Sequence, residues 1–243
     1  MVRAMCALFT PRLCLLAAVP LLAPMVGCRD TQTSDSLRTK QIAALIDVTS
    51  EGEGDPSVRV ELAVGWQYGD LVKLEKGDVL TATSGDEKAV LKSSSAGIYT
   101  ASLPVPGDGE VVIDFDRAEE QDAPSSKGTL PMPFLIHAPW AGEAFSRADE
   151  DLLVEWDDVA NATGTIEFSG DCILTLSRDV TNELGYVTIP AGTLESATPN
   201  APESCAVDIE IEIERDGTPD PALDGDSYFR AVQRRVVTIG SDP

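Results

Sequence analysis

Regular alternation of apolar and polar residues limits the fold of this chain more than any other feature of its sequence. The clearest example is residues 205–214, where apolar side chains alternate with acids. The apolar positions are Cys205, Val207, Ile209, Ile211 and Ile213, and the acids are Asp208, Glu210, Glu212 and Glu214. Successive side chains of a β-strand point to opposite faces, so this segment is predicted to be a half-buried strand.

The same alternation recurs in short segments along the chain, about every 8–12 residues, a spacing typical of antiparallel sandwiches. Turn sequences such as Lys76-Gly77-Asp78 and Gly107-Asp108-Gly109 separate these segments. Sustained helical periodicity is missing from the sequence. The predicted fold class is therefore all-β, and Tyr99 and Phe115 are expected in the core.

The alternating segments fall into two blocks, 41–118 and 132–243. Residues 119–131 between them carry charges and turn formers in place of alternation, beginning with Glu119-Glu120-Gln121-Asp122. A length of 243 residues allows one or two domains. We predict two tandem antiparallel β-sandwiches joined by a linker at 119–131. The alternative is a single larger sandwich in which this segment is one long loop.

The N-terminus has the pattern of an export signal. Residues 1–27 contain Arg3 and Arg12, no acid, and a mostly apolar run that ends at Gly27. A basic start, a short apolar stretch and a small terminal residue are typical of a secretory signal peptide. A transmembrane helix fits less well, because the run is short and Pro20 and Pro24 interrupt it.

Met25-Val26-Gly27-Cys28 resembles a bacterial lipobox, the cleavage site of prolipoproteins. The resemblance implies that Cys28 becomes the acylated first residue and that the protein's partner is a lipid bilayer. Residues 28–40 are polar and are expected to form a flexible tether. Arg29, in place of the aspartate that commonly retains lipoproteins at an inner membrane, implies an outer-membrane location. The alternative is ordinary secretion with a free thiol at Cys28.

Cysteine usage agrees with export. The five cysteines are Cys6, Cys14, Cys28, Cys172 and Cys205. If the first two leave with the signal and Cys28 is acylated, two remain in an oxidising compartment, which predicts a disulfide between Cys172 and Cys205. Two buried free thiols are the alternative. Two thiols and one distant histidine, His137, do not fill a tetrahedral zinc shell.

A second resemblance covers the C-terminal block. The stretch from Ala138-Pro139-Trp140-Ala141-Gly142 to Leu153-Val154-Glu155-Trp156 resembles the opening of an immunoglobulin-like or fibronectin type III-like domain. It implies two immunoglobulin-like sandwiches, with Trp156 in the core of the second. The whole chain is similar to bacterial lipoproteins with tandem sandwich domains. Trp156 precedes both late cysteines, so the expected bridge is not the one found in antibody domains.

Charge excludes one class of partner. The chain has 18 basic and 41 acidic residues and a net charge of −23. Such an acidic surface argues against nucleic-acid binding, which needs a basic footprint. Within the last predicted strand, 229–239, the three arginines Arg230, Arg234 and Arg235 are expected to pair across the sheet with the glutamates.

Motifs for catalysis are missing: the sequence has no G-x-S-x-G, H-E-x-x-H, P-loop or G-x-G-x-x-G pattern. An enzyme would need an unrecognised carboxylate pair, such as Glu155 with Asp157 or Asp158. His137 is expected to be a partly exposed loop or strand residue. No catalytic residue or organic cofactor is predicted.

A candidate calcium site is the acidic, turn-rich segment 216–226, because hard carboxylate oxygens suit Ca²⁺. Its four acids are Asp216, Asp220, Asp224 and Asp226. Their spacing differs from an EF-hand, which favours a solvated loop. We expect a membrane-anchored, non-catalytic lipoprotein of the bacterial envelope with a structural role or an envelope or cell-surface protein partner. The alternatives are a calcium-dependent adhesion or glycan-binding module and an enzyme with a carboxylate site.

Overall fold

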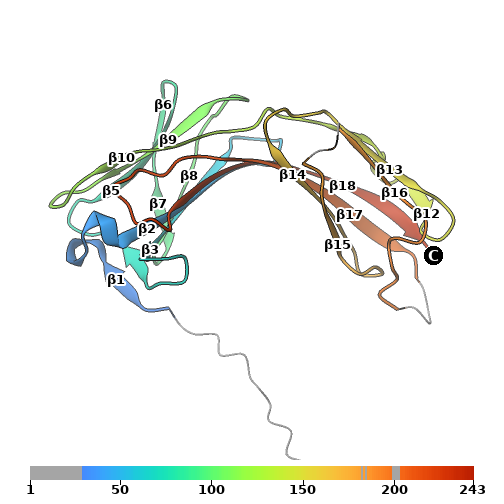
Figure 1. The fold of residues 1–243 in the computed structure, drawn as a ribbon, viewed down its shortest axis with the longest axis horizontal. Coiled ribbons are helices and arrows are strands. Elements are labelled where there is room, and N and C mark those ends of the chain that lie inside the picture. The colour runs from blue at the N-terminus through green and yellow to red at the C-terminus, as the bar shows by residue number, and fades with distance from the viewer. Residues whose placement is uncertain (1–28, 182, 184, 199–202) are drawn as a thin grey trace, which may run out of the picture.

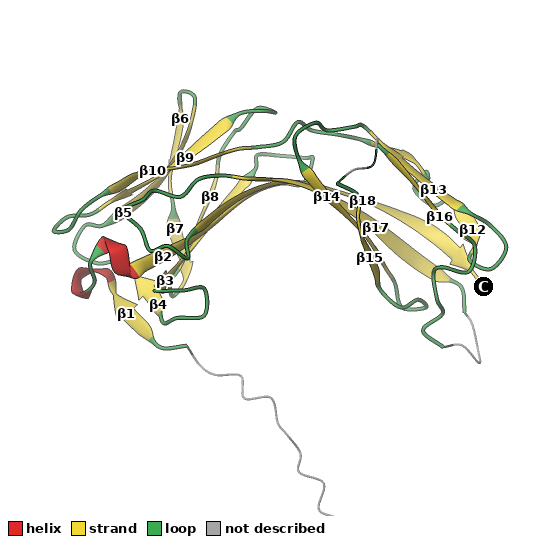
Figure 2. Cartoon of the chain, viewed as in Figure 1, coloured by secondary structure: helices red, strands yellow, loops and turns green. Residues whose placement is uncertain are grey.

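A computed structural model describes residues 29–181, 183, 185–198 and 203–243. The predicted signal peptide, 1–27, and Cys28 lie outside these residues. Within them, the chain is built almost entirely of β-strands, which confirms the all-β prediction. Its helical parts are two short 3-10 turns, η1 (Ser34–Ser36) and η2 (Thr39–Gln41), close to the first strand (Figure 2).

One large sheet of eleven strands runs through the molecule and curves into an arch (Figure 1). Its main path is β1 (Thr31–Thr33), β4 (Leu71–Lys73), β3 (Ser57–Val64), β2 (Ile42–Ser50), β18 (Tyr228–Asp242), β17 (Cys205–Asp216), β14 (Thr163–Ser169) and β15 (Leu176–Asp179). Off this path lie β7 (Lys92–Ser95), β8 (Ile98–Ser102) and β12 (Ala144–Ser146). The long β17–β18 hairpin forms the centre of the arch.

Two small sheets cover the convex side of this arch, one over each half (Figure 1). The first contains β10 (Ala123–Thr129), β9 (Glu110–Asp116), β5 (Val79–Ser84) and β6 (Glu87–Val90). The second contains β11 (Ile136–Ala138), β13 (Leu152–Trp156) and β16 (Tyr186–Ile189). Each small sheet buries its inner face against the large sheet, so the molecule has two sandwiches that share one layer.

Each sandwich has its own hydrophobic core. Tyr99 and Phe115 are buried in the first core, and Trp156 is buried in the second, as the alternation predicted. Full burial of one such large apolar side chain stabilises a fold by about 1.5–3 kcal/mol. The predicted strand at 205–214 is confirmed, because Ile209 and Ile211 are fully buried in the second core.

The two predicted domains are not separate segments of the chain, which corrects the expected boundaries at 41–118 and 132–243. Leu223 and Phe229, from the C-terminal block, pack in the first core. The first half of β18 pairs in parallel with β2, with Phe229 opposite Ile46. Alternation shows that a strand has a buried face, but it does not show which core that face contacts. It therefore could not reveal that β18 contributes to both cores.

The predicted flexible tether is also wrong for residues 31–40. These residues form β1 and the two 3-10 turns, and Ser34, Leu37 and Thr39 are buried. The buried guanidinium of Arg117 contacts the two turns. Its Nη2 donates to the carbonyl oxygens of Ser34 at 2.8 Å and Leu37 at 3.0 Å, and its Nη1 donates to Thr39 Oγ1 at 3.1 Å. This distant arginine and the pairing of β1 with β4 together order a polar segment.

The predicted linker at 119–131 forms regular structure over most of its length. Residues Ala123–Thr129 are strand β10, which pairs with β9 after a register shift between Ala123 and Ser126. Ala123 and Ser126 are buried. The linker prediction is wrong here because Pro124, Ser125 and Ser126 have low strand propensity, and the edge pairing with β9 overrides that propensity.

Candidate functional site

The concave face of the large sheet, opposite both cores, carries a row of charged side chains. Because strand residues alternate, the four acids of β17 point away from the core: Asp208, Glu210, Glu212 and Glu214. On β18 the same face presents Arg230 and Arg234, and Arg234 lies directly opposite Glu212. We call these residues, together with Arg29, Asp47, Glu51, Arg59 and Glu61, the charged row.

The predicted cross-strand pairing is confirmed for two of the three arginines. Arg234 Nε lies 2.8 Å from Glu212 Oε1 and 3.4 Å from Glu210 Oε1. Arg230 Nη1 lies 3.7 Å from Glu214 Oε2, and its Nε lies 3.1 Å from Asp47 Oδ1 of β2. The prediction is wrong for Arg235, which points to the convex side. Its Nε donates to the carbonyl oxygen of Phe134 at 3.0 Å, and its guanidinium lies 5.2 Å from the centre of the Phe134 ring.

The charged row continues across β2 and β3 to the start of the described chain. Arg59 lies between two acids, with Nη1 3.7 Å from Asp47 Oδ2 and Nη2 2.6 Å from Glu61 Oε2. Arg29 Nη1 lies 2.5 Å from Glu61 Oε1. The four arginines of the row are therefore all paired with acids, but the row has seven acids and stays net negative. Cross-strand pairs of this kind stabilise the register of the strands.

The pKa values of two acids of the charged row are shifted in opposite directions. Burial raises the pKa of Glu61, but hydrogen bonds from Arg29 and Arg59 outweigh that effect, and the net pKa lies below the usual value. Burial also raises the pKa of Glu210. The charge of Arg234 lowers this pKa, whereas nearby acids including Glu212 raise it further, and the net pKa lies above the usual value. The charged form of Glu61 is thus favoured by the fold, and that of Glu210 is not.

We expect Glu61→Gln to lower the free energy of unfolding at pH 7 by about 1 kcal/mol, because hydrogen bonds to two charged guanidinium groups are lost at a partly solvated site. The folded-state pKa of Glu61 is depressed, so its contribution is present above the unfolded value near 4.5 and disappears as the pH falls through the folded value. Urea unfolding of the wild-type protein and of Glu61→Gln at pH 7 and at pH 3 tests this: the difference in the free energy of unfolding between the two proteins should be smaller at pH 3.

Glu210→Gln is the matched control for that variant. Because the fold disfavours the charged form of Glu210, neutralising it is not expected to lower the free energy of unfolding at pH 7. Equal losses in the two variants would contradict the assignment of Glu61 as the stabilising acid of the pair.

Two of the four acids proposed for calcium, Asp220 and Asp224, accept hydrogen bonds from the protein through their carboxylates. Asp220 is buried; its Oδ2 accepts hydrogen bonds from the amide and hydroxyl of Ser125 at 2.9 and 2.6 Å, and its Oδ1 accepts from the Ala222 amide at 2.8 Å. Asp224 Oδ1 accepts from the amide of Asp226 at 3.0 Å. Asp216 ends β17, opposite Arg230. Among the described residues, no three His, Cys, Asp or Glu side chains are close enough to share an ion.

We therefore expect millimolar Ca²⁺ to leave the melting temperature unchanged, and Asp220→Ala to lower it with or without Ca²⁺. Asp220 fixes the turn before β18 through its hydrogen bonds to the protein, so its loss leaves the amides of Ser125 and Ala222 without this acceptor. Differential scanning calorimetry with Ca²⁺ and with EDTA measures both effects. A rise of the melting temperature in Ca²⁺ that Asp220→Ala abolishes would show that Asp220 takes part in binding Ca²⁺.

The carboxylates considered for catalysis do not converge. Glu155 points outward from β13, whereas Asp157 holds the β11 segment. Asp157 Oδ1 lies 2.8 Å from His137 Nε2, and its Oδ2 accepts from the Leu135 amide at 2.9 Å. The hydrogen bond with His137 lowers the pKa of Asp157. His137 is half exposed, as expected, and no second acid is bonded to it in the part of the chain that the structure describes.

Exposed apolar side chains gather on the outer face of the β11–β13–β16 sheet. Leu153 is 42% exposed and Tyr186 is 53% exposed. Leu153 lies opposite Thr188 and Tyr186 opposite Glu155, so both side chains project from the same outer face. Trp140 is 73% exposed in the segment that follows β11. Apolar residues presented together in this way are typical of protein contact surfaces.

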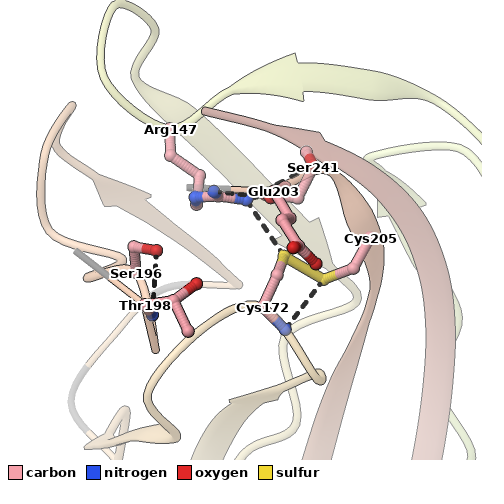
Figure 3. The surroundings of a disulfide bond; sticks show 7 residues. All are labelled: Arg147, Cys172, Ser196, Thr198, Glu203, Cys205 and Ser241. Atoms are coloured by element: carbon pink, nitrogen blue, oxygen red, sulfur yellow. Dashed lines mark hydrogen bonds between the residues drawn. A yellow bond between two sulfur atoms is a disulfide. The ribbon is translucent and has the colours of Figure 1, made fainter. Parts of the chain in front are cut away.

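The predicted disulfide is confirmed: Cys172 and Cys205 are bonded, with their Cα atoms 5.8 Å apart (Figure 3). The buried Arg147 packs beside it. Its Nη1 donates to Cys172 Sγ at 3.1 Å and to Ser241 Oγ at 2.9 Å, and its Nη2 donates to the Glu203 carbonyl at 2.9 Å. The bridge and this arginine together tie the 170–176 segment to the start of β17 and the end of β18.

Sequence reasoning missed both buried arginines, Arg117 and Arg147, because nothing in the local pattern distinguishes them from surface arginines. Neither a comparison with protein-family models nor one with curated proteins returns a match to this chain. Among the described residues, no helix is long and apolar enough to cross a membrane.

Proposed function

We propose that this protein is a membrane-anchored, extracytoplasmic lipoprotein of the bacterial envelope, held at the outer membrane by acyl chains on Cys28. The Cys172–Cys205 disulfide carries the proposal. Structural disulfides belong to oxidising compartments. The bonded pair is also the one left over if Cys6 and Cys14 are removed with a signal peptide and Cys28 is acylated.

Mass spectrometry of the native N-terminus tests the anchor. The expected result is a chain that begins at Cys28, with a thioether-linked diacylglycerol on its sulfur and an acyl group on its amine. Cys28→Ser should release the protein from the membrane fraction, whereas Cys172→Ser should leave its N-terminus acylated. A native chain that keeps residues 1–27 or has an unmodified Cys28 would refute the proposal.

The role we propose for the anchored protein is structural or protein-binding, without catalysis. The outer face of the β11–β13–β16 sheet supports this, because it presents Leu153 and Tyr186 to solvent on a rigid sheet. Apolar side chains on the same face of a strand pair can bury their surface against a partner without any change in the fold.

Crosslinking in intact envelopes tests the binding role. The variant Leu153→Asp/Tyr186→Asp is expected to lose the crosslinked product of the wild-type protein. Leu174→Asp is the control, because Leu174 is similarly exposed but lies outside this sheet face. All three proteins should have the same circular dichroism spectrum. Unchanged crosslinking in the double variant would exclude this face as the contact.

A further inference from the structure

The start of the described chain lies against an aromatic turn between β3 and β4. Arg29 Nε donates to the carbonyl oxygen of Gly69 at 2.7 Å, and the Leu71 amide donates to the carbonyl of Asp30 at 2.8 Å. Thr31 then pairs with Leu71 as β1 joins β4 in parallel. The chain therefore leaves the fold beside residues 65–69, which we call the aromatic turn. In Figure 1 this corner is at the β1 end of the arch.

The aromatic turn is held rigidly by backbone hydrogen bonds. The Gly65 amide donates to the Gln41 carbonyl at 2.9 Å, the Gly69 amide donates to the Trp66 carbonyl at 2.8 Å, and the Val64 amide donates to the Asp70 carbonyl at 2.8 Å. The exposed side chains of the turn thus have a fixed position relative to Arg29.

Two large aromatic side chains project from this turn into solvent. Trp66 is 53% exposed and Tyr68 is 65% exposed, and their rings meet edge to face with centroids 5.1 Å apart. Tryptophan and tyrosine combine an apolar ring with a polar group, and for this reason they are enriched at the boundary between lipid headgroups and acyl chains.

Cys28 immediately precedes Arg29 in the sequence, so an acyl anchor on Cys28 would be attached to the chain one residue before Arg29. Since Arg29 is bonded to Gly69, acyl chains on Cys28 would bring a bilayer to the aromatic turn. Of the acids near this turn, Glu61 is paired with Arg29 and Arg59, and Asp70 accepts a hydrogen bond from Gln32.

We propose that Trp66 and Tyr68 insert into the headgroup region of the bilayer that holds Cys28, forming a second membrane contact beside the lipid anchor. This inference rests on the proposed acylation of Cys28. It implies that the folded body sits on the membrane at its β1 corner, because residues 31–40 are packed into the fold and leave no long spacer.

Tryptophan quenching by brominated lipids tests this contact. The lipidated full-length protein, with its acyl groups verified by mass spectrometry, is reconstituted into phosphatidylcholine vesicles with or without bromine on the acyl chains. The protein has three tryptophans, and the other two lie in the second sandwich: Trp140 is exposed and Trp156 is buried. We expect brominated lipid to quench the wild-type protein and the Trp140→Phe variant, and the quenching to be lost in Trp66→Phe.

The outcomes separate this inference from the proposed function. Acylated protein whose Trp66 fluorescence is the same in both kinds of vesicle would overturn the membrane contact and leave the anchor intact. Quenching that persists in Trp66→Phe and disappears in Trp140→Phe would also overturn it. An N-terminus without lipid would refute the proposed function itself.

Discussion

Replacing Cys172 and Cys205 together with serine is expected to lower the free energy of unfolding by roughly 3–4 kcal/mol, because the bridge closes a loop between residues 33 positions apart. The bond limits the conformations of the unfolded chain in that segment. Its loss also removes the sulfur that accepts a hydrogen bond from the buried Arg147. Urea unfolding of the soluble Cys28→Ser form measures the effect.

Reduction is the control for this prediction. Dithiothreitol should destabilise the disulfide-bonded protein by about the same amount as the double substitution and should have no effect on the double-serine variant. A double-serine variant that unfolds at the same urea concentration as the oxidised protein would show that the bridge does not stabilise the fold.

Replacing Arg117 with methionine is expected to cost about 3–5 kcal/mol, because it leaves the buried carboxylate of Asp78 without its ion-pair partner. The two side chains are 1% and 4% exposed, and Arg117 Nε lies 2.8 Å from Asp78 Oδ2. The substitution also removes the hydrogen bonds that Arg117 donates to the carbonyl oxygens of Ser34 and Leu37. Urea unfolding measures the global effect, and hydrogen exchange should show faster exchange at residues 34–41.

Two further variants give this prediction its specificity. Adding Asp78→Asn to Arg117→Met should recover part of the loss, because the uncompensated buried charge is removed. Lys73→Met, which breaks the exposed ion pair with Glu75, should leave the urea midpoint unchanged. If Arg117→Met and Lys73→Met behave alike, Arg117 does not hold the N-terminal segment in place.

Period-two patterning predicts the strands that bury one face regularly, but not β1 or β10. It located the buried face at 205–214 and placed Tyr99, Phe115 and Trp156 in the cores, because burial of one face of a strand imposes alternation directly on the sequence. The disulfide could be predicted by counting the cysteines expected to remain after export and lipidation.

Interactions between distant residues could not be predicted in this way. Residues 31–40 have no alternation, and their order depends on Arg117, about eighty positions later in the chain. The calcium prediction treated 216–226 as an isolated loop. Asp220 is instead committed to Ser125 and Ala222, and Ser125 lies in a strand that was expected to be linker. In both cases the contact is polar and joins residues far apart in the sequence, so the alternation of apolar and polar residues does not reveal it.

The shared β17–β18 hairpin has a consequence for how this chain can be divided. A fragment that ends at residue 131 would contain the whole first small sheet, but it would lack Phe229 and Ala231 in its core. It would also leave the β18-facing side of β2 without a neighbour from Leu45 to Ser50. Unpaired strand edges recruit other chains. Cleavage between the two sandwiches would therefore give self-associating pieces, because the molecule is one cooperative body whose halves are completed by the same pair of strands.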